Sequence, residues 1–292
     1  MLSILIPVYN YPISNLVNRL YQEALKLKID FEILVQEDAS NLYLDSNQNI
    51  KSLRNVSYQI NRTNIGRTAS RQALAIKAKF DNLLFLDADV LPAYNNFIEQ
   101  FLKYNYKADV IVGGTKYEKK LIDNKYSLRW KFGNKRESKT VQNRNKKKYL
   151  SVISQCLWIK KNAFLKANKN MQNSYGMDIF FSYQLKLNNI SVKHIENPIY
   201  HLGLETNEVF LLKSLQALDT LILLENQNKI PQDYSNIQRA YKKLEKTLMI
   251  SPFRILLNNF DSFFKTNLIS TNPKLLYFDL YRLSYYLKKK HV

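Results

Sequence analysis

Two aspartates at the end of a hydrophobic stretch are the residues of this chain best placed to do chemistry. The stretch LLFLDADV (83–90) begins like a buried strand and runs into Asp87 and Asp89, with Ala88 between them. On a regular strand the side chains at i and i+2 point the same way, and two unpaired carboxylates so placed repel each other. A divalent cation removes that conflict, and hard oxygen ligands suit Mg²⁺ or Mn²⁺. The spacing predicts a metal site, with a solvated turn as the alternative.

A second feature combines a glycine turn with two arginines. In NRTNIGRTASRQALA (61–75), Gly66 permits a tight turn, and Arg67 and Arg71 lie one helical turn apart where a helical pattern begins. A helix N-terminus with two guanidinium groups can hold a phosphate or a base edge. The alternative is an ordinary helix start with solvated arginines.

The elements that must position these residues alternate between strand-like and helix-like segments. Strands are expected at 2–9, 31–36, 56–60, 82–86 and 109–114, and helices at 13–28, 69–80 and 94–104. Such alternation predicts a mostly parallel α/β sheet, whose ligands bind beyond the carboxyl ends of the strands. Asp87 and Asp89 fall at that edge, and so do Glu37 and Asp38, which end the 31–36 strand.

Composition limits the class of protein and of partner. The chain has 292 residues, a net charge of +20 and a single cysteine, Cys156. The charge predicts an anionic partner, but it does not choose among nucleic acid, a phosphorylated metabolite and an acidic membrane. One cysteine excludes an internal disulfide and favours a reducing, cytoplasmic compartment. No run of about 18 uncharged apolar residues predicts a membrane-spanning helix, and MLSILIPVYN is interpreted as a first strand rather than a signal peptide.

Two regions differ from this alternation. Residues 116–149 are rich in Lys and Arg and poor in apolar residues, and are predicted to form a long loop over the site. From about residue 205 the pattern is helical throughout. We therefore expect a catalytic domain at 1–205 and a C-terminal helical region at 206–292.

The segments SILIPVYN, QEDAS, NIGRTASRQALA and LLFLDADV, in this order and spacing, resemble the family 2 glycosyltransferases of GT-A fold over residues 1–205. The resemblance implies a Rossmann-like, mostly parallel sheet flanked by helices, with a C-terminal helical extension, and a Mn²⁺ or Mg²⁺ cofactor. Glu37 departs from the aspartate more usual at its position. The residues implied to bind the nucleotide are Pro7, Tyr9, Asp38, Arg67, Arg71 and Asp87, and those implied to bind the metal are Asp89, Asp87 and His201.

The resemblance also implies a catalytic base about ninety residues after the aspartate pair. NSYGMDIFFSYQL (173–185) supplies Asp178, while Met177 stands where the commoner pattern has a first acid. The alternative for Asp178 is an aspartate favoured by the helix dipole, and for His201 a structural histidine. In LRWKFGNKRESK and the rest of the basic segment, the resemblance implies a loop over the diphosphate and acceptor groove, with Arg129, Arg136 and Arg144 as candidates.

The implied reaction is inverting transfer of a sugar from a nucleotide-sugar donor, with a UDP-sugar favoured, to a glycan or lipid-linked acceptor. The abundance of Asn, Lys and Ile favours a bacterial source and a role in envelope polysaccharide or lipopolysaccharide synthesis. A sugar-phosphate nucleotidyltransferase is an alternative, although no glycine-rich loop follows the first strand. A nucleic-acid-binding protein is another, but acidic strand ends would face the phosphates, so no nucleic acid is expected.

The C-terminal segment KLLYFDLYRLSYYLKKK (274–290) suggests a membrane contact. Tyr277, Tyr281 and Tyr285 recur along it at i, i+4 and i+8, and three lysines end it. Such a helix could rest on an anionic bilayer at the inner face of the cytoplasmic membrane. The alternative is a C-terminal helix packed on the catalytic domain, with a solvated tail.

Overall fold

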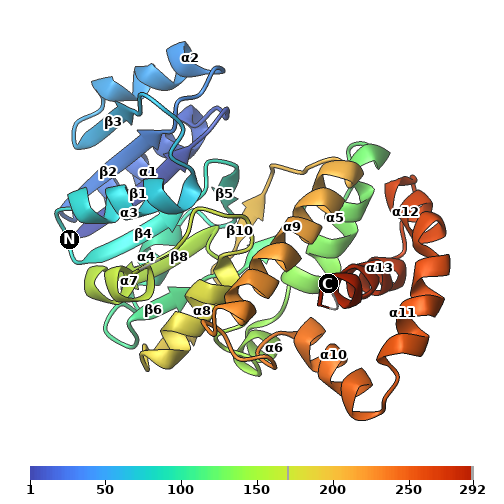
Figure 1. Cartoon of the computed structure of the whole chain (residues 1–292). Coiled ribbons are helices and arrows are strands. Elements are labelled where there is room, and N and C mark those ends of the chain that lie inside the picture. The colour runs from blue at the N-terminus through green and yellow to red at the C-terminus, as the bar shows by residue number, and fades with distance from the viewer. Residues whose placement is uncertain (170, 291–292) are drawn as a thin grey trace. The chain divides into compact units, whose positions relative to one another are not determined.

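The computed structural model describes residues 1–169 and 171–290, which form two compact units (Figure 1). The first unit comprises Met1–Tyr117, Glu137–Asn173 and Gln184–Gly203. The second comprises Glu118–Arg136, Ser174–Tyr183 and the chain from Leu204 onward. The units are therefore discontinuous in sequence, and the division predicted at residue 205 stays a prediction.

The first unit is built on a seven-stranded sheet. Its strands are β1 (Leu2–Val8), β2 (Phe31–Glu37), β3 (Val56–Ile60), β4 (Asn82–Leu86), β6 (Val110–Val112), β8 (Cys156–Lys160) and β9 (Val192–His194). Their order is β3-β2-β1-β4-β8-β6-β9, and β8 alone runs antiparallel to its neighbours. The predicted mostly parallel sheet is thus confirmed, and the predicted strands lie where the sequence indicates.

Short and medium helices flank this sheet. They are α1 (Ser14–Lys26), α2 (Leu44–Gln48), α3 (Arg67–Lys77), α4 (Phe97–Leu102), α6 (Val141–Asn145) and α7 (Lys161–Ala167), with the 3₁₀ turn η1 (Asn49–Ser52). β1 is buried along its whole length, which explains its unbroken apolar run. Ile4 and Ile6 pack with Leu16 and Leu20 of α1 in the main hydrophobic core.

A small second sheet crosses the end of β4. It contains β5 (Val90–Pro92), β7 (Thr115–Lys116) and β10 (Ile199–His201), in the order β5-β10-β7. β10 is antiparallel to β5, and His201 lies opposite Val90. Residues more than 100 positions apart in sequence therefore meet directly after the aspartate pair.

The long loop predicted at 116–149 is wrong, because much of the segment is helical. It contains η2 (Asn124–Tyr126), α5 (Ser127–Phe132), the π-helical turn η3 (Gly133–Glu137) and α6. Leu128 and Phe132 lie one turn apart on α5 and pack with Phe210 and Phe278. Two apolar residues one turn apart thus anchor a helix that also carries Arg129 and Lys131.

The second unit is helical, as the sequence predicts. Besides α5 it contains α9 (Asn207–Asn226), α10 (Asn236–Lys246), α11 (Ile250–Asn259), α12 (Asp261–Ile269) and α13 (Leu275–Lys290), and α8 (Asp178–Leu187) begins in it and ends in the first unit. α10 begins with a capping box, in which Ser235 and Gln238 bond each other's backbone N–H groups. Within the described ranges no helix is long and apolar enough to cross a membrane.

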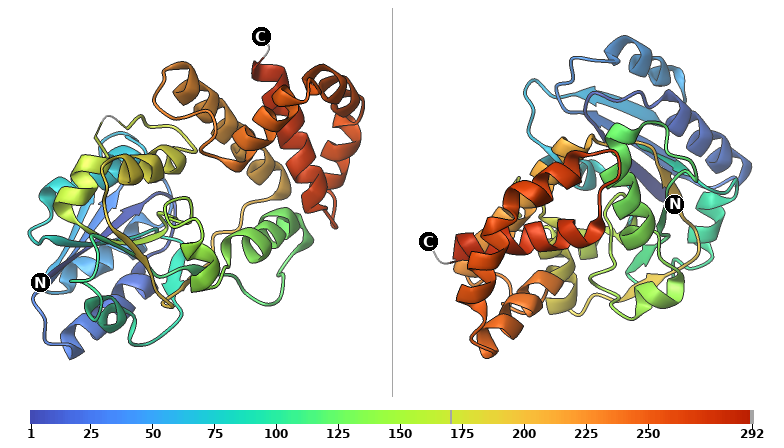
Figure 2. Two further views of the ribbon diagram at one scale, coloured as in Figure 1. Left: turned by 90° about the horizontal axis from the view of Figure 1, so that it is seen from below. Right: turned by 90° about the vertical axis from the view of Figure 1, so that its right-hand side faces the viewer.

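α13 packs inside the second unit. Phe278, Tyr286 and Leu287 are almost fully buried, and the helix lies against α9, α11 and α12 (Figure 2). The apolar face of this helix is thus buried within the second unit. The membrane contact of the helix and the alternative of packing on the catalytic domain both stay predictions.

Candidate active site

The candidate site lies at the carboxyl ends of β1, β2 and β4, where the parallel strands of the first unit place their following loops on one edge. Asp38 comes directly after β2 and Asp87 directly after β4. The backbone N–H of Asp38 donates to the carbonyl of Val8 at the end of β1, 2.8 Å away. The shared edge predicted from the sequence is thus present.

Asp89 and His201 form the central pair of this site. The Nε2 atom of His201 lies 3.1 Å from Oδ2 of Asp89, and the imidazole is 6% exposed. The backbone N–H of Leu202 donates to the carbonyl of Asp89 over 2.8 Å. Pairing of β5 with β10 therefore brings together two of the three residues that the sequence proposed as metal ligands.

An aromatic ring also packs against the imidazole of His201. Tyr117 packs edge-on against His201, with ring centroids 5.5 Å apart and an interplanar angle of 80°. The hydroxyl of Tyr117 in turn donates to the carboxylate of Glu137. The buried Nδ1 of His201 has no hydrogen-bond partner in the described part of the chain. The pairing with Asp89 and the packing against Tyr117 orient this ring.

The electrostatics of Asp89 reflect both burial and neighbouring groups. Burial alone would raise the pKa of the Asp89 carboxyl, but the hydrogen bond and charge of His201, together with Arg67, outweigh it and hold the pKa below its ordinary value. Burial, with a contribution from Asp89, raises the pKa of Tyr11. Tyr11 is a neighbour of the site that the sequence reasoning missed.

Asp87 lies between two arginines. Arg67 donates to Oδ2 and Arg71 to Oδ1, each over 2.6 Å, and Arg71 also donates to the carbonyl of Ser154 over 2.6 Å. Arg71 is buried, whereas the Arg67 side chain is 42% exposed. The helix start predicted to hold a phosphate thus neutralises Asp87, and Arg67 is the arginine that solvent reaches.

Asp38 organises the loop before α3. Its Oδ1 accepts from the N–H of Ile65 over 2.9 Å and its Oδ2 from the N–H of Gly66 over 2.7 Å. Gly66 has a φ of 81°, and a Cβ there would overlap the side chain of Asn173. Asn173 donates to the carbonyl of Ile65. The loop that begins the arginine helix is therefore fixed by Asp38 from one side and by Asn173 from the other.

Glu37, where an aspartate is more usual, is fully buried. Its carboxylate accepts hydrogen bonds from Ser40, from Asn47 over 3.2 Å and from the hydroxyl of Tyr58 over 2.8 Å. Burial and the contact with Glu37 raise the pKa of Tyr58. Glu37, which is longer than an aspartate, thus accepts hydrogen bonds from three segments. These bonds hold the start of the loop that carries Asp38.

The remaining residues implied to bind the nucleotide lie on the loop after β1. Pro7 is buried within β1, and Tyr9 is 54% exposed. Asn10, with a φ of 52°, accepts from the N–H groups of Asn41 and Leu42. The loops after β1 and β2 are thereby tied together, with the Tyr9 ring open to solvent beside them.

The side chains at this site that could ligate a metal fit a divalent cation in part. Two neighbouring ligands of an octahedral ion with bonds of about 2.1 Å lie about 3 Å apart, which matches the separation of Asp89 from His201. Asp87, by contrast, is occupied by Arg67 and Arg71. Across the described residues, no group of three or more His, Cys, Asp or Glu side chains gathers as a metal site. Asp89 and His201 are therefore the residues able to hold the ion.

Arg144, a candidate for the diphosphate, is buried in the first unit. Its guanidinium donates to the carbonyls of Val112, Gly113 and Ile195 at 2.9, 3.2 and 2.8 Å, and burial lowers its pKa. These contacts fix the turn after β6 rather than bringing Arg144 to the carboxylates. Its proposed diphosphate role stays a prediction.

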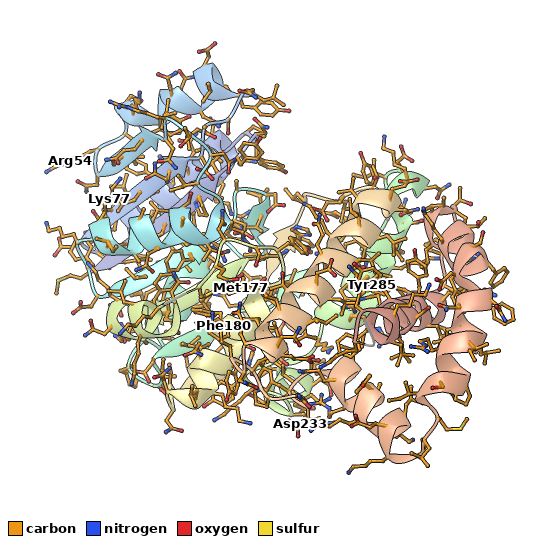
Figure 3. All side chains as sticks on the ribbon, in the orientation of Figure 1. Arg54, Lys77, Met177, Phe180, Asp233 and Tyr285 are labelled. Carbon is orange, nitrogen blue, oxygen red and sulfur yellow. The ribbon has the colours of Figure 1, made fainter. Side chains whose placement is uncertain are left out.

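The other candidates lie in the second unit. Asp178 is the exposed first residue of α8, beside the buried Met177 and near Phe180 (both labelled in Figure 3). Arg129 is buried over the ring of Phe210. Arg136 donates to Asp279 over 2.5 Å. The contacts of Arg129 and Arg136 lie within the second unit. The proposed functional roles of Asp178, Arg129 and Arg136 stay predictions.

Comparison with known proteins identifies the family. The model described as Glycosyl transferase family 2 matches residues 3–166, more than half of the chain. The chain therefore belongs to this family. No curated protein matches it.

Solved structures support the same fold. A mannosyltransferase of Pyrobaculum calidifontis, PcManGT, in complex with GDP-Man and Mn²⁺ has a TM-score of 0.53 and 12% identity, covering 76% of this chain and 64% of its own. TarS of S. aureus, residues 1–349, has a TM-score of 0.51 and 15% identity, covering 99% and 91%. A TarS complex with UDP has a TM-score of 0.50 and 16% identity, covering 99% and 90%. The chain thus has the GT-A fold. It spans about two-thirds of the length of the mannosyltransferase.

Proposed function

We propose that this protein is a metal-dependent, inverting glycosyltransferase. It moves a sugar from a nucleotide-sugar donor, with a UDP-sugar favoured, to a hydroxyl of a glycan or lipid-linked acceptor, in envelope polysaccharide or lipopolysaccharide synthesis. The observation that carries the proposal is the Asp89–His201 pair at the strand-end edge of a family 2 glycosyltransferase fold. Solved structures similar to this chain contain GDP-Man with Mn²⁺ or UDP, which supports a nucleotide-sugar as the donor.

The residues of the first unit have distinct roles in this proposal. Asp89 and His201 would hold Mn²⁺ or Mg²⁺, which would supply positive charge that stabilises the departing diphosphate. Arg67 is open to solvent on one side and supplies positive charge for the diphosphate. Asp38 keeps the loop before α3 in place, so that the base of the nucleotide meets an ordered surface beside Tyr9.

The transfer itself needs a base and no protein nucleophile. The acceptor oxygen forms a bond to the anomeric carbon, while the bond from that carbon to the phosphate oxygen breaks and the nucleoside diphosphate leaves with its electrons. Asp178 accepts the proton of the acceptor hydroxyl. Attack opposite to the leaving group inverts the anomeric configuration.

The experiment is a transfer assay with UDP-, GDP- and dTDP-sugars and an extract of envelope glycans and glycolipids as acceptors, with nucleotide release and product anomers measured. Asp178→Asn should reduce transfer by about 10²- to 10⁴-fold and leave nucleotide affinity unchanged. Asp233→Asn, in the same unit (Figure 3), is the matched control. Near-normal transfer by Asp178→Asn would contradict the assigned base, and a product of retained configuration would contradict direct displacement.

A further inference from the structure

The second unit exposes a set of apolar side chains along α11 and α12. We call Ile255, Leu256, Phe260 and Phe263 the apolar row; they are 62%, 52%, 46% and 53% exposed. Ile255 and Leu256 lie on α11 and Phe263 lies on α12. Phe260 directly follows α11 and directly precedes α12, so the row spans the junction of the two helices.

Packing within the unit covers this row only in part. Phe260 lies beside Phe264, and Phe263 lies beside Phe264 and Tyr277, with ring centroids 5.3–6.0 Å apart, yet all four side chains of the row stay 46% or more exposed. The same two helices carry Leu257, Phe264 and Leu268, which are buried, and Leu257 and Phe264 share a cluster with Leu287 of α13. α13 lies against both α11 and α12 (Figures 1 and 2). The two helices therefore carry more apolar side chains than the core of the unit buries. A group of apolar side chains that stays in water is a feature of interaction surfaces.

The chain that carries the row is mostly basic. Arg254 and Lys265 lie on α11 and α12, Lys246 and Lys274 lie a few residues before and after these helices, and the acid between residues 246 and 277 is Asp261. The carboxylate of Asp261 is already engaged, because it accepts from Ser284 over 2.8 Å and pairs with Lys288. This segment of the chain therefore offers an apolar and basic surface, and its acid is neutralised.

We propose that this surface binds an anionic lipid bilayer, with the apolar row in the interfacial region and the four cations at the lipid phosphates. Apolar burial and attraction to anionic lipid act together in such binding. A second copy of the chain would bring the same four cations face to face, which disfavours self-association. Nucleic acid is disfavoured because Ile255 and Leu256 offer neither a charge nor a ring for stacking.

This inference changes the location of the membrane contact expected from the sequence. The three lysines that end α13 are engaged within the second unit: Lys288 with Asp261, Lys289 with Asp219 at 3.6 Å and Lys290 with Glu225 at 2.6 Å. The apolar face of α13 is also buried, and α13 packs against the two helices that carry the row. The inference goes beyond the proposed transfer reaction and does not depend on it, since no donor or metal takes part in bilayer binding.

The test is flotation of the full chain with vesicles of phosphatidylcholine alone or in equimolar mixture with phosphatidylglycerol. The apolar variant is Ile255→Ser with Phe263→Ser, and its matched control is Ile122→Ser, which is 86% exposed in the same unit. The charge variant is Lys265→Glu, and its control is the exposed Lys107→Glu of the first unit. Thermal unfolding of each variant verifies that it folds.

We expect binding to the phosphatidylglycerol vesicles, weakened by raising salt, and little binding to phosphatidylcholine alone. The apolar variant should lower the partition coefficient at least about tenfold, and Lys265→Glu about tenfold, while both controls bind as the wild type does. Absence of wild-type binding would overturn the proposal, and so would equal loss in the controls. Light scattering that shows a dimer abolished by the apolar variant would assign the surface to self-association instead. Nucleotide binding, measured on the same samples, reports separately on the proposed function.

Discussion

The backbone of Gly203 lies directly against the carboxylate of Asp89. A Cβ at residue 203 would stand 2.0 Å from Oδ2 and 2.8 Å from the Cβ of Asp89. Because Leu202 also bonds the carbonyl of Asp89, the chain leaving β10 closes over this aspartate. Gly203 is thus required for the close approach that sets the position of Asp89.

Gly203→Ala should displace the Asp89 carboxylate, because the contact is with a side chain already confined by His201. We expect a loss of about 1–3 kcal/mol in the free energy of unfolding and at least tenfold weaker metal-dependent nucleotide binding. Denaturant titration and calorimetry measure the two effects. Leu202→Ala, at a side chain on the same segment that is 38% exposed, is the control. Unchanged nucleotide binding in Gly203→Ala would contradict the assigned close approach.

Arg71→Lys should destabilise the first unit more than Arg67→Lys. Arg71 is buried and bonds both Asp87 and the carbonyl of Ser154, and a lysine lacks the planar fork that reaches both. The expected loss in the free energy of unfolding is about 1–3 kcal/mol. The half-exposed Arg67 should lose less than about 1 kcal/mol. Equal effects of the two substitutions on urea midpoints would refute this ranking.

Stability should fall in mild acid because of His194. Its Nε2 donates to the carbonyl of Lys148 over 2.8 Å and its Nδ1 lies 3.2 Å from a nitrogen of Arg144. Burial, and to a lesser degree Arg144, lowers the pKa of His194 to about 4. The folded state therefore keeps the ring neutral between about pH 6.5 and pH 4, while the unfolded state binds a proton.

The unfolded state binds more protons in this window, so the contribution of His194 to stability is lost as the pH falls. Between pH 7 and pH 5 the loss amounts to about 2 kcal/mol. His194→Gln should be less stable at pH 7 but show a flatter curve over this range, measured by urea unfolding at each pH. Parallel curves for the wild type and the variant would show that His194 does not titrate as proposed.

Sequence patterns predict the main sheet well because its strands depend on local features. Buried runs such as LSILIPV and NLLFL need only their own hydrophobicity to be recognised, and the end of the run places Asp87 at the sheet edge. The helix around Leu128 and Phe132 is harder to predict, because its charged residues are stabilised by tertiary partners. Arg129 packs on Phe210, and Arg136 pairs with Asp279.

The same limit applies to the site. The sequence identifies Asp89 and His201 separately, but their contact depends on the antiparallel pairing of two three-residue strands, β5 and β10. Strands this short carry no usable periodicity. The engagement of Asp87 by Arg67 and Arg71, and of lysines 288–290 by acids of the second unit, likewise depends on tertiary geometry.

The most direct test of the central claim is thermal unfolding with UDP, GDP or dTDP, with and without Mn²⁺, for the wild type, Asp89→Asn and the control Asp30→Asn. The account predicts that one nucleotide stabilises the wild type only with Mn²⁺, by about 2.7 kcal/mol at about 100 times its Kd. Asp30→Asn should retain this stabilisation and Asp89→Asn should lose it. Stabilisation of Asp89→Asn equal to that of the wild type, or stabilisation independent of Mn²⁺, would contradict the assignment of Asp89 as the metal ligand of a nucleotide-sugar site.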